Sequence, residues 1–231
     1  MNISKPPDNS VSDRRIALFR KKLLVWFPVN GRVFPWRVKG AGTYVLLVVE
    51  VLLQRTRAET VAAFLPHFLQ RYSGWSAIAS SNLDELAATL KPIGLWRRRS
   101  PALQGLAQEL VAIGEKWPRR RDELEKITAV GQYLANATLL FIHGEPHPLM
   151  DSSMARLLRR YFFIRPVKAD IRYDRALHAA AYRILASGHA IELNWAMLDI
   201  AASYCKSRKP LCVNCPLRQS CMHYRYLVKL R

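Results

Sequence analysis

The chain has 231 residues, enough for one large domain or two small lobes, and half of them are hydrophobic. Its 36 lysines and arginines against 17 aspartates and glutamates give a formal net charge of +19, which favours a polyanion such as nucleic acid as partner; the alternative is a solvated basic surface. No apolar run reaches the roughly 18 residues of a membrane span, and the N-terminus lacks the apolar core of a secretory signal, so a cytoplasmic protein without membrane contact is expected.

The sequence predicts helix after helix. Residues 1–12 are polar and are expected to form a loose tail, and the first helix begins near residue 14 and stops before Pro28. Residues 44–56 are strongly apolar; their β-branched residues make a strand a rival interpretation, but length favours a helix. Proline and glycine mark nearly every junction and no alternating strand pattern appears, so an all-α fold is expected. Further helices are predicted over residues 56–72, 83–90, 101–117, 121–127, 132–144, 153–163, 174–188 and 191–205.

Glu50 is the only charged residue between Lys39 and Arg55, and aliphatic residues flank it on both sides. An ionised carboxylate in such surroundings is costly unless it is paired, so burial should raise its pKa. Glu50 is therefore a candidate general acid. A structural glutamate bonded to backbone amides is an equal alternative.

Two turns between predicted helices offer polar groups. Backbone amides in the turn at residues 128–131 could hold a phosphate, although one glycine between helices is usually a simple connector. Asp151 opens a helix, which predicts an N-cap; it would also be catalytic if its second oxygen faced a cleft. The arginines that follow suit phosphates or form a solvated basic face, and they are Arg156, Arg159 and Arg160.

Four cysteines, the only ones in the chain, close the sequence with the spacing C-x6-C-x2-C-x5-C: Cys205, Cys212, Cys215 and Cys221. Such clustering is typical of a metal centre rather than of a disulfide framework. The chain is also long enough to build a core without disulfides. Because both zinc and iron–sulfur clusters are held by four thiolates, the spacing leaves the two open.

Together these features resemble the helix-hairpin-helix DNA glycosylases with an iron–sulfur cluster, the endonuclease III superfamily. The resemblance covers roughly residues 14–221. Its motifs, in chain order, are FPWR at 34–37, VEVLLQRT at 49–56, Val130-Gly131, Asp151 twenty residues after Gly131, and the cysteine loop. The resemblance implies that Glu50 is the catalytic glutamate and that the four cysteines hold one 4Fe–4S cluster.

Position 133 separates branches of that family. Endonuclease III-like lyases carry a lysine there, whose amine forms the Schiff base for strand cleavage. This chain has Tyr133, which implies a monofunctional glycosylase. Adenine mismatch glycosylases usually have serine, whereas tyrosine is typical of mismatch thymine glycosylases known from archaea. Segments 52–58 and 94–103 also resemble that branch, and the ten residues after Cys221 leave no room for the 8-oxoguanine-reading domain of adenine glycosylases.

Two positions depart from the family pattern. The hairpin normally reads Leu-Pro-Gly-Val-Gly, but this chain reads ITAVG at 127–131, so Ala129 replaces a glycine. A Cβ there would be costly if the residue needs a positive φ. The asparagine usually found two residues after the aspartate is Ser153, which changes the contact to the base or sugar.

The resemblance implies two closely packed helical lobes. A six-helix barrel lobe with the hairpin would hold residues 40–152, and the cluster lobe would join residues 13–39 to 153–231. Glu50 and Asp151 would face each other in the cleft between them. Asp151 would stabilise the cation-like sugar, Glu50 would act as acid or proton relay, and Tyr133 would line the base pocket. The expected DNA contacts are Gln54, which fills the gap left by the flipped base, together with Arg55, Val130, Gly131, Gln132 and Ser153.

The expected function is excision of a flipped, mispaired base from double-stranded DNA in base excision repair, with thymine or uracil opposite guanine as the favoured substrate. Two alternatives stay open. One is an adenine mismatch glycosylase without the 8-oxoguanine-reading domain, and the other is a non-catalytic DNA-binding protein of the same fold. A cytoplasmic monomer is expected, associated with the nucleoid if the source is prokaryotic.

Overall fold

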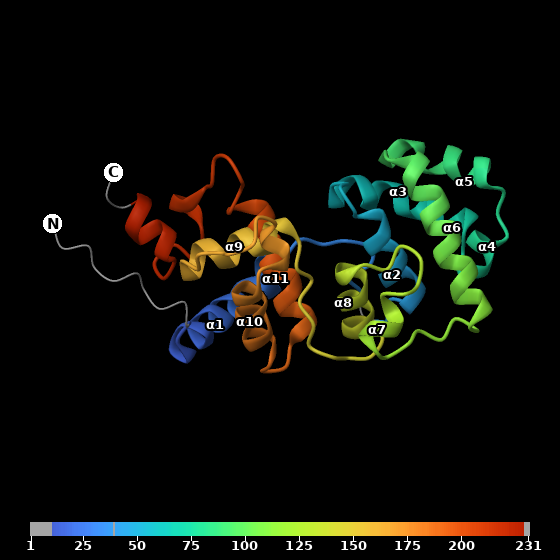
Figure 1. Cartoon of the computed structure of the whole chain (residues 1–231). Helices are drawn as coiled ribbons and strands as arrows, with labels where there is room; N and C mark the ends of the chain where they lie inside the picture. The colour runs from blue at the N-terminus through green and yellow to red at the C-terminus, as the bar shows by residue number, and fades with distance from the viewer. Residues whose placement is uncertain (1–10, 39, 229–231) are drawn as a thin grey trace. The chain divides into compact units, whose positions relative to one another are not determined.

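The computed structural model describes residues 11–38 and 40–228, and in these ranges every regular element is a helix (Figure 1). The predicted all-α class is confirmed for this part of the chain, and the rival strand over residues 44–56 does not form there. None of the described helices is both long and apolar enough to cross a membrane. The expected loose tail lies outside the described residues, except for Val11 and Ser12, the N-cap of the first helix.

The chain forms two compact units. Unit 1 joins Met1–Arg32 to Pro146–Arg231, and unit 2 is Val33–Glu145. The sequence predicts lobe boundaries at 39/40 and 152/153, whereas packing divides the chain at 32/33 and 145/146. The stacked pair Phe34 and Trp36, with ring centroids 4.7 Å apart, therefore belongs to unit 2. Asp151 belongs to unit 1.

Unit 2 consists of helices that pack mainly on α6 and on α2. Its elements are α2 (Thr43–Leu52), α3 (Ala58–Arg71), α4 (Trp75–Ala79), α5 (Leu83–Leu90), η1 (Lys91–Ile93), α6 (Trp96–Ala112), α7 (Arg121–Leu124) and α8 (Gln132–Phe141). Helices α4 and α5 pack on α6, and α2 packs on α8 and α3. The six residues from Leu47 to Leu52 are all buried, and Glu50 is the one charged side chain among them.

Unit 1 contains the first helix and the C-terminal part of the chain from Pro146. Its elements are α1 (Asp13–Asn30), α9 (Ser152–Phe162), η2 (Ile171–Tyr173), α10 (Arg175–Leu185), α11 (Ala190–Ser203), η3 (Cys212–Asn214) and η4 (Tyr224–Val228). Helix α11 packs on both α1 and α9, and α10 contacts all three. Buried Asp199 on α11 fixes the end of α1 by accepting from the backbone N–H of Arg32 and from its Nε, each at 2.8 Å.

Two proline positions were predicted incorrectly as helix boundaries. Helix α1 continues through Pro28 to Asn30, and α6 begins at Trp96, so Pro101 lies within it. Pro28 occupies the last turn, where a missing N–H removes only one bond and Gly31 N still donates to Phe27 O at 2.8 Å. Proline near a helix end is thus compatible with continued helix.

Candidate active site and cysteine pocket

Glu50 and Tyr133 meet inside unit 2. Glu50 lies on α2 with 4% of its surface exposed, and the hydroxyl of Tyr133, on α8, donates to its Oε2 at 2.8 Å. The contact exists because α2 packs directly on α8 (Figure 1). A buried carboxylate needs a hydrogen-bond donor, and here a phenol from the helix after the hairpin supplies one. Neither the acid nor its partner faces bulk water freely.

The turn after α2 presents Gln54 and Arg55 on the surface, and both side chains are exposed. Arg55 has a φ of 59°, in the left-handed region that a residue with a Cβ adopts only under constraint. The buried guanidinium of Arg99 donates to the carbonyl of Gln54 at 2.7 Å. Sequence reasoning did not single out Arg99, because within the run WRRRS nothing distinguishes an inward arginine from an outward one.

The hairpin between α7 and α8 is a turn between two helices, as predicted, and it spans residues 125–131. Gly131 is the N-cap of α8, and Gln132 is its first residue. Val130 is buried, with 4% of its surface exposed, so little of this residue is open to a ligand. A Cβ built on Gly131 would meet no atom within 4 Å. The space beside this glycine is therefore open within the chain.

A hydrogen-bonded clamp holds the hairpin, and no local pattern in the chain predicts it. The backbone N–H of Thr128 donates to Glu109 Oε2 at 3.0 Å, and the Thr128 hydroxyl donates to Glu109 Oε1. Glu109 lies on α6. A proline at position 128, as in the family motif, would have no N–H for the first bond.

Ala129 has a φ of 64°, so this hairpin places an alanine where glycine is the relaxed residue. The left-handed conformation costs a residue with a Cβ about 1–2 kcal/mol, while glycine loses roughly 0.5–1 kcal/mol in chain entropy. Ala129→Gly should therefore raise the free energy of unfolding by about 0.5–1 kcal/mol, measured by chemical denaturation.

The matched control is Ala63→Gly, at an exposed position inside α3. There glycine should lower the free energy of unfolding by about 1 kcal/mol, because the backbone is ordinary helix. Opposite signs for the two changes identify strain at residue 129. A loss of stability at both positions would contradict it.

Asp151 is the N-cap of α9, as predicted. Its Oδ1 accepts from the backbone N–H of Met154 at 2.7 Å, and its Oδ2 accepts from the hydroxyl of Ser153. Oδ1 therefore caps α9, and Oδ2 holds the hydroxyl of Ser153, the position at which the family resemblance predicts an asparagine. Asp151 itself is partly exposed.

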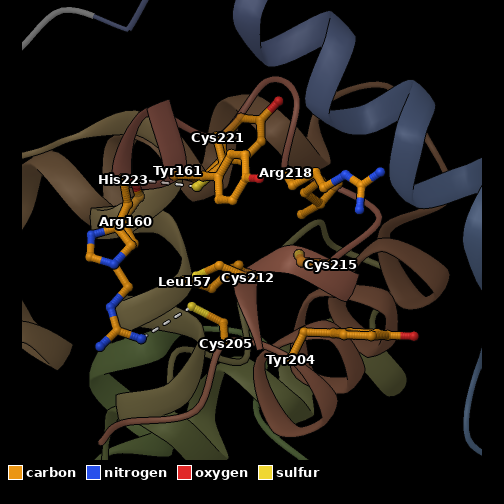
Figure 2. Close-up of a pocket in the computed structure, with 12 residues that line it drawn as sticks. Leu157, Arg160, Tyr161, Tyr204, Cys205, Cys212, Cys215, Arg218, Cys221 and His223 are labelled. Carbon is orange, nitrogen blue, oxygen red and sulfur yellow. Dashed lines mark hydrogen bonds between the residues drawn. The ribbon is translucent and has the colours of Figure 1, made fainter. Parts of the chain in front are cut away.

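The four cysteines line one pocket of unit 1, with about 360 Å³ of space including its open mouth (Figure 2). Figure 2 shows them on different sides of that pocket, together with Leu157, Tyr161 and His223. Burial raises the pKa of the Cys215 thiol to about 12. A thiolate here therefore needs a cation to stabilise it. In the described ranges, no three His, Cys, Asp or Glu side chains are placed to share a single metal ion.

Two arginines of α9 bind the cysteine loop, which corrects the expectation of a solvated or phosphate-binding face. Arg156 Nε donates to the carbonyl of Cys205 at 2.7 Å. Arg160 donates to the Cys205 sulfur at 3.5 Å and to the carbonyls of Lys206 and Ser207 at 2.7 and 3.0 Å. Of the three predicted cations, only Arg159 is exposed.

Comparisons with known proteins agree on enzymes of DNA repair. Residues 48–180 match the model of the HhH-GPD superfamily of base excision DNA repair proteins. The chain is 35% identical to the thymine-DNA glycosylase of Aeropyrum pernix, over 91% of this chain and 96% of that protein. It is 32% identical to the thymine/uracil-DNA glycosylase of Pyrobaculum aerophilum, over 90% and 92%. The solved structure of a thermostable thymine-DNA glycosylase has a TM-score of 0.80 at 27% identity, covering 92% of this chain and 98% of that one.

Proposed function

Because the chain belongs to the HhH-GPD superfamily of base excision DNA repair proteins, we propose that it is a monofunctional DNA N-glycosylase that removes thymine or uracil mispaired with guanine. Its similarity to the thymine-DNA glycosylase of Aeropyrum pernix and the thymine/uracil-DNA glycosylase of Pyrobaculum aerophilum supports that choice of base. As such an enzyme it would work as a cytoplasmic monomer on double-stranded DNA.

The observation that carries the proposal is the hydrogen bond from Tyr133 to buried Glu50, 2.8 Å long. It joins the helix that bears the candidate acid to the helix that follows the hairpin. A carboxyl group that is buried and held by a phenol can carry a proton and deliver it to the departing base in a site from which water is largely excluded. Tyr133 also has no amine, so it cannot form the Schiff base that strand cleavage by a lyase requires.

The reaction is hydrolysis of the bond between C1′ of the deoxyribose and the base nitrogen. The bond is out of reach in the stack, so the nucleotide must first flip out, and a mispaired base flips at lower cost. As the bond breaks, its electron pair leaves with the base and the sugar becomes cation-like. Asp151 stabilises that cation, orients the water whose oxygen bonds to C1′ and takes up the proton that this water loses. Glu50, directly or through a water, supplies the proton that the departing base takes up.

The hairpin would grip the DNA backbone. The N-terminus of α8 carries the positive end of the helix dipole, and the open space beside Gly131 would let a phosphate approach it. Gln54 and Arg55 would enter the duplex where the base has left. The net charge of +19 adds sequence-independent affinity, so binding should weaken steeply with salt.

We further propose that Cys205, Cys212, Cys215 and Cys221 bind one 4Fe–4S cluster. A set of four thiols fits such a cluster, and all four cysteines line the same pocket. When bound, the cluster would fix the loop that carries exposed Lys206, Arg208 and Lys209. The hydrolysis itself uses none of its chemistry.

The purified protein should contain about four irons and four acid-labile sulfides per chain and absorb in the blue. Cys215→Ser should lower both contents together. One zinc per chain without sulfide would instead identify a mononuclear site, and this outcome would leave the glycosylase proposal intact.

The function is tested by single-turnover excision on duplexes with G·T, G·U and A·8-oxoguanine pairs. We expect removal of thymine and uracil, and no covalent enzyme–DNA adduct when borohydride is present. Removal of adenine alone would favour the adenine mismatch glycosylase, and tight, salt-dependent binding without excision of any base would favour a non-catalytic DNA-binding protein. Efficient trapping by borohydride would show that a lysine elsewhere acts.

A further inference from the structure

Arg99 is a charged side chain that the proposed mechanism does not use. It lies on α6 with 6% of its surface exposed, and burial lowers its pKa. Its Nη1 donates to the carbonyls of Ile93 and Gly94, at 3.2 and 2.7 Å. Its Nη2 donates to the carbonyl of Gln54 and to Thr56 Oγ1, at 2.7 and 3.0 Å. One guanidinium therefore joins two turns of which Thr56 and Ile93 are 37 residues apart in sequence.

The two joined turns are backbone-strained and exposed. Arg55 in the first has a φ of 59°, and Leu95, next to Gly94 in the second, has a φ of 53°. Thr56 completes the link, because its hydroxyl donates to Ile93 O at 3.1 Å while accepting from Arg99. Residues with a Cβ keep such conformations only where the surrounding structure holds them.

Stability alone does not account for this arrangement. In the described residues Arg99 has three carbonyls and one hydroxyl as acceptors and no carboxylate. A buried cation without an anion is a poor stabilising device compared with an apolar side chain. Its geometry does suit the holding of a loop, because the planar guanidinium fixes several acceptors at set angles, which a lysine ammonium cannot do.

The surface above Arg99 is cationic. Arg97 lies over the ring of Trp96, with its Cζ 4.3 Å from the centroid, and Lys91 Nζ lies 5.4 Å from the same centroid. Arg55, Arg57 and Arg98 are also exposed around these turns. A surface of this kind attracts a nucleic acid backbone, and the turns that Arg99 fixes stand within it.

We infer that Arg99 is a positioning residue for base flipping: it holds the Gln54–Arg55 backbone rigid against the turn at Ile93–Gly94, so that this loop can hold open the space left by the flipped nucleotide. The inference rests on the proposed function, because it assigns the loop a role in opening the duplex. It places no demand on the bond-breaking step, which Glu50 and Asp151 carry.

The test compares Arg99→Lys with wild type on two duplexes, one with a G·U pair and one with uracil opposite an abasic analogue. The second uracil is unpaired, so it leaves the stack with little help. Arg99→Lys should lower the single-turnover excision rate about tenfold on G·U, which corresponds to a rise of about 1.4 kcal/mol in the activation free energy. On the unpaired uracil the rate should fall much less. Thr56→Val should act in the same direction with a smaller effect.

A fluorescent 2-aminopurine beside the uracil gives a second readout, because its emission rises when the neighbouring base unstacks. Arg99→Lys should reduce that rise on the G·U duplex. The rise needs no bond cleavage, so it decides the role of Arg99 even if wild type excised nothing, an outcome that would sink the proposed function separately.

Ile78→Val and Ile78→Ala, at a fully buried position on α4, are the controls for stability. The first should lower the melting temperature less than Arg99→Lys does, and the second should lower it more. They should leave the ratio of the two excision rates unchanged. Equal losses on both duplexes for Arg99→Lys, or a change in ratio shared by the Ile78 variants, would overturn the inference and leave Arg99 a plain structural residue.

Discussion

Asp151→Asn should lower single-turnover excision by about 10²-fold or more while the protein stays folded and still binds duplex DNA. Asparagine keeps an oxygen that can accept from Met154 N, the bond that Asp151 makes at 2.7 Å, so the cap of α9 survives. Asparagine and aspartate are nearly equal as N-caps. What disappears is the negative charge that the proposed mechanism sets against the cation-like sugar.

Asp174→Asn is the matched control, because Asp174 is another N-cap aspartate of unit 1. Its Oδ1 accepts from the N–H groups of Ala176 and Leu177, and its Oδ2 accepts from those of Val167 and Lys168. Asparagine keeps one oxygen, so its NH₂ group cannot accept one of these two pairs of bonds. Asp174→Asn should therefore lose about 1–3 kcal/mol of stability but keep its excision rate at a permissive temperature. Near-normal excision by Asp151→Asn would remove Asp151 from the chemistry.

Helices were largely predictable because they leave a local signature. The helix over residues 83–90 has the predicted bounds, and Asn82 caps it by accepting from the N–H groups of Asp84 and Glu85. The short helix Trp75–Ala79 escaped prediction, because five residues are too few for an apolar period to emerge. The prolines misled for a related reason: their effect depends on their place in the helix, which the local sequence does not give.

The site was predictable residue by residue, but its contacts were not. Isolation among aliphatic residues singled out Glu50, yet nothing in the spacing paired it with Tyr133, 83 positions away. That pairing comes from the packing of α2 on α8. The sequence predicts a cost for Ala129 only if this residue has a positive φ. Its φ of 64° meets that condition, and the sequence alone does not give this angle. The arginines show the limit most clearly, since Arg99, Arg156 and Arg160 all turn inward to bind carbonyls.

Glu50→Gln should lower excision by about 10²- to 10⁴-fold, the range typical of a lost general acid. Glutamine has nearly the same shape, and its carbonyl oxygen can still accept from the Tyr133 hydroxyl, so the packing of α2 on α8 should survive. The measurement is single-turnover excision on a G·T duplex, with thermal unfolding to show that the protein is intact. Glu85→Gln, at an exposed glutamate paired with Arg71, is the control and should leave excision unchanged.

Tyr133→Phe separates a catalytic glutamate from a structural one. Removing the hydroxyl leaves the buried carboxylate with one donor fewer, which should cost about 1–3 kcal/mol of stability. If Glu50 carries the proton, Tyr133→Phe should lower excision through Glu50, and adding it to Glu50→Gln should lower the rate little further, because residues that act as a unit are not additive. If Glu50 were only a bonded core residue, Glu50→Gln would keep nearly full excision, and the stability losses alone would be coupled.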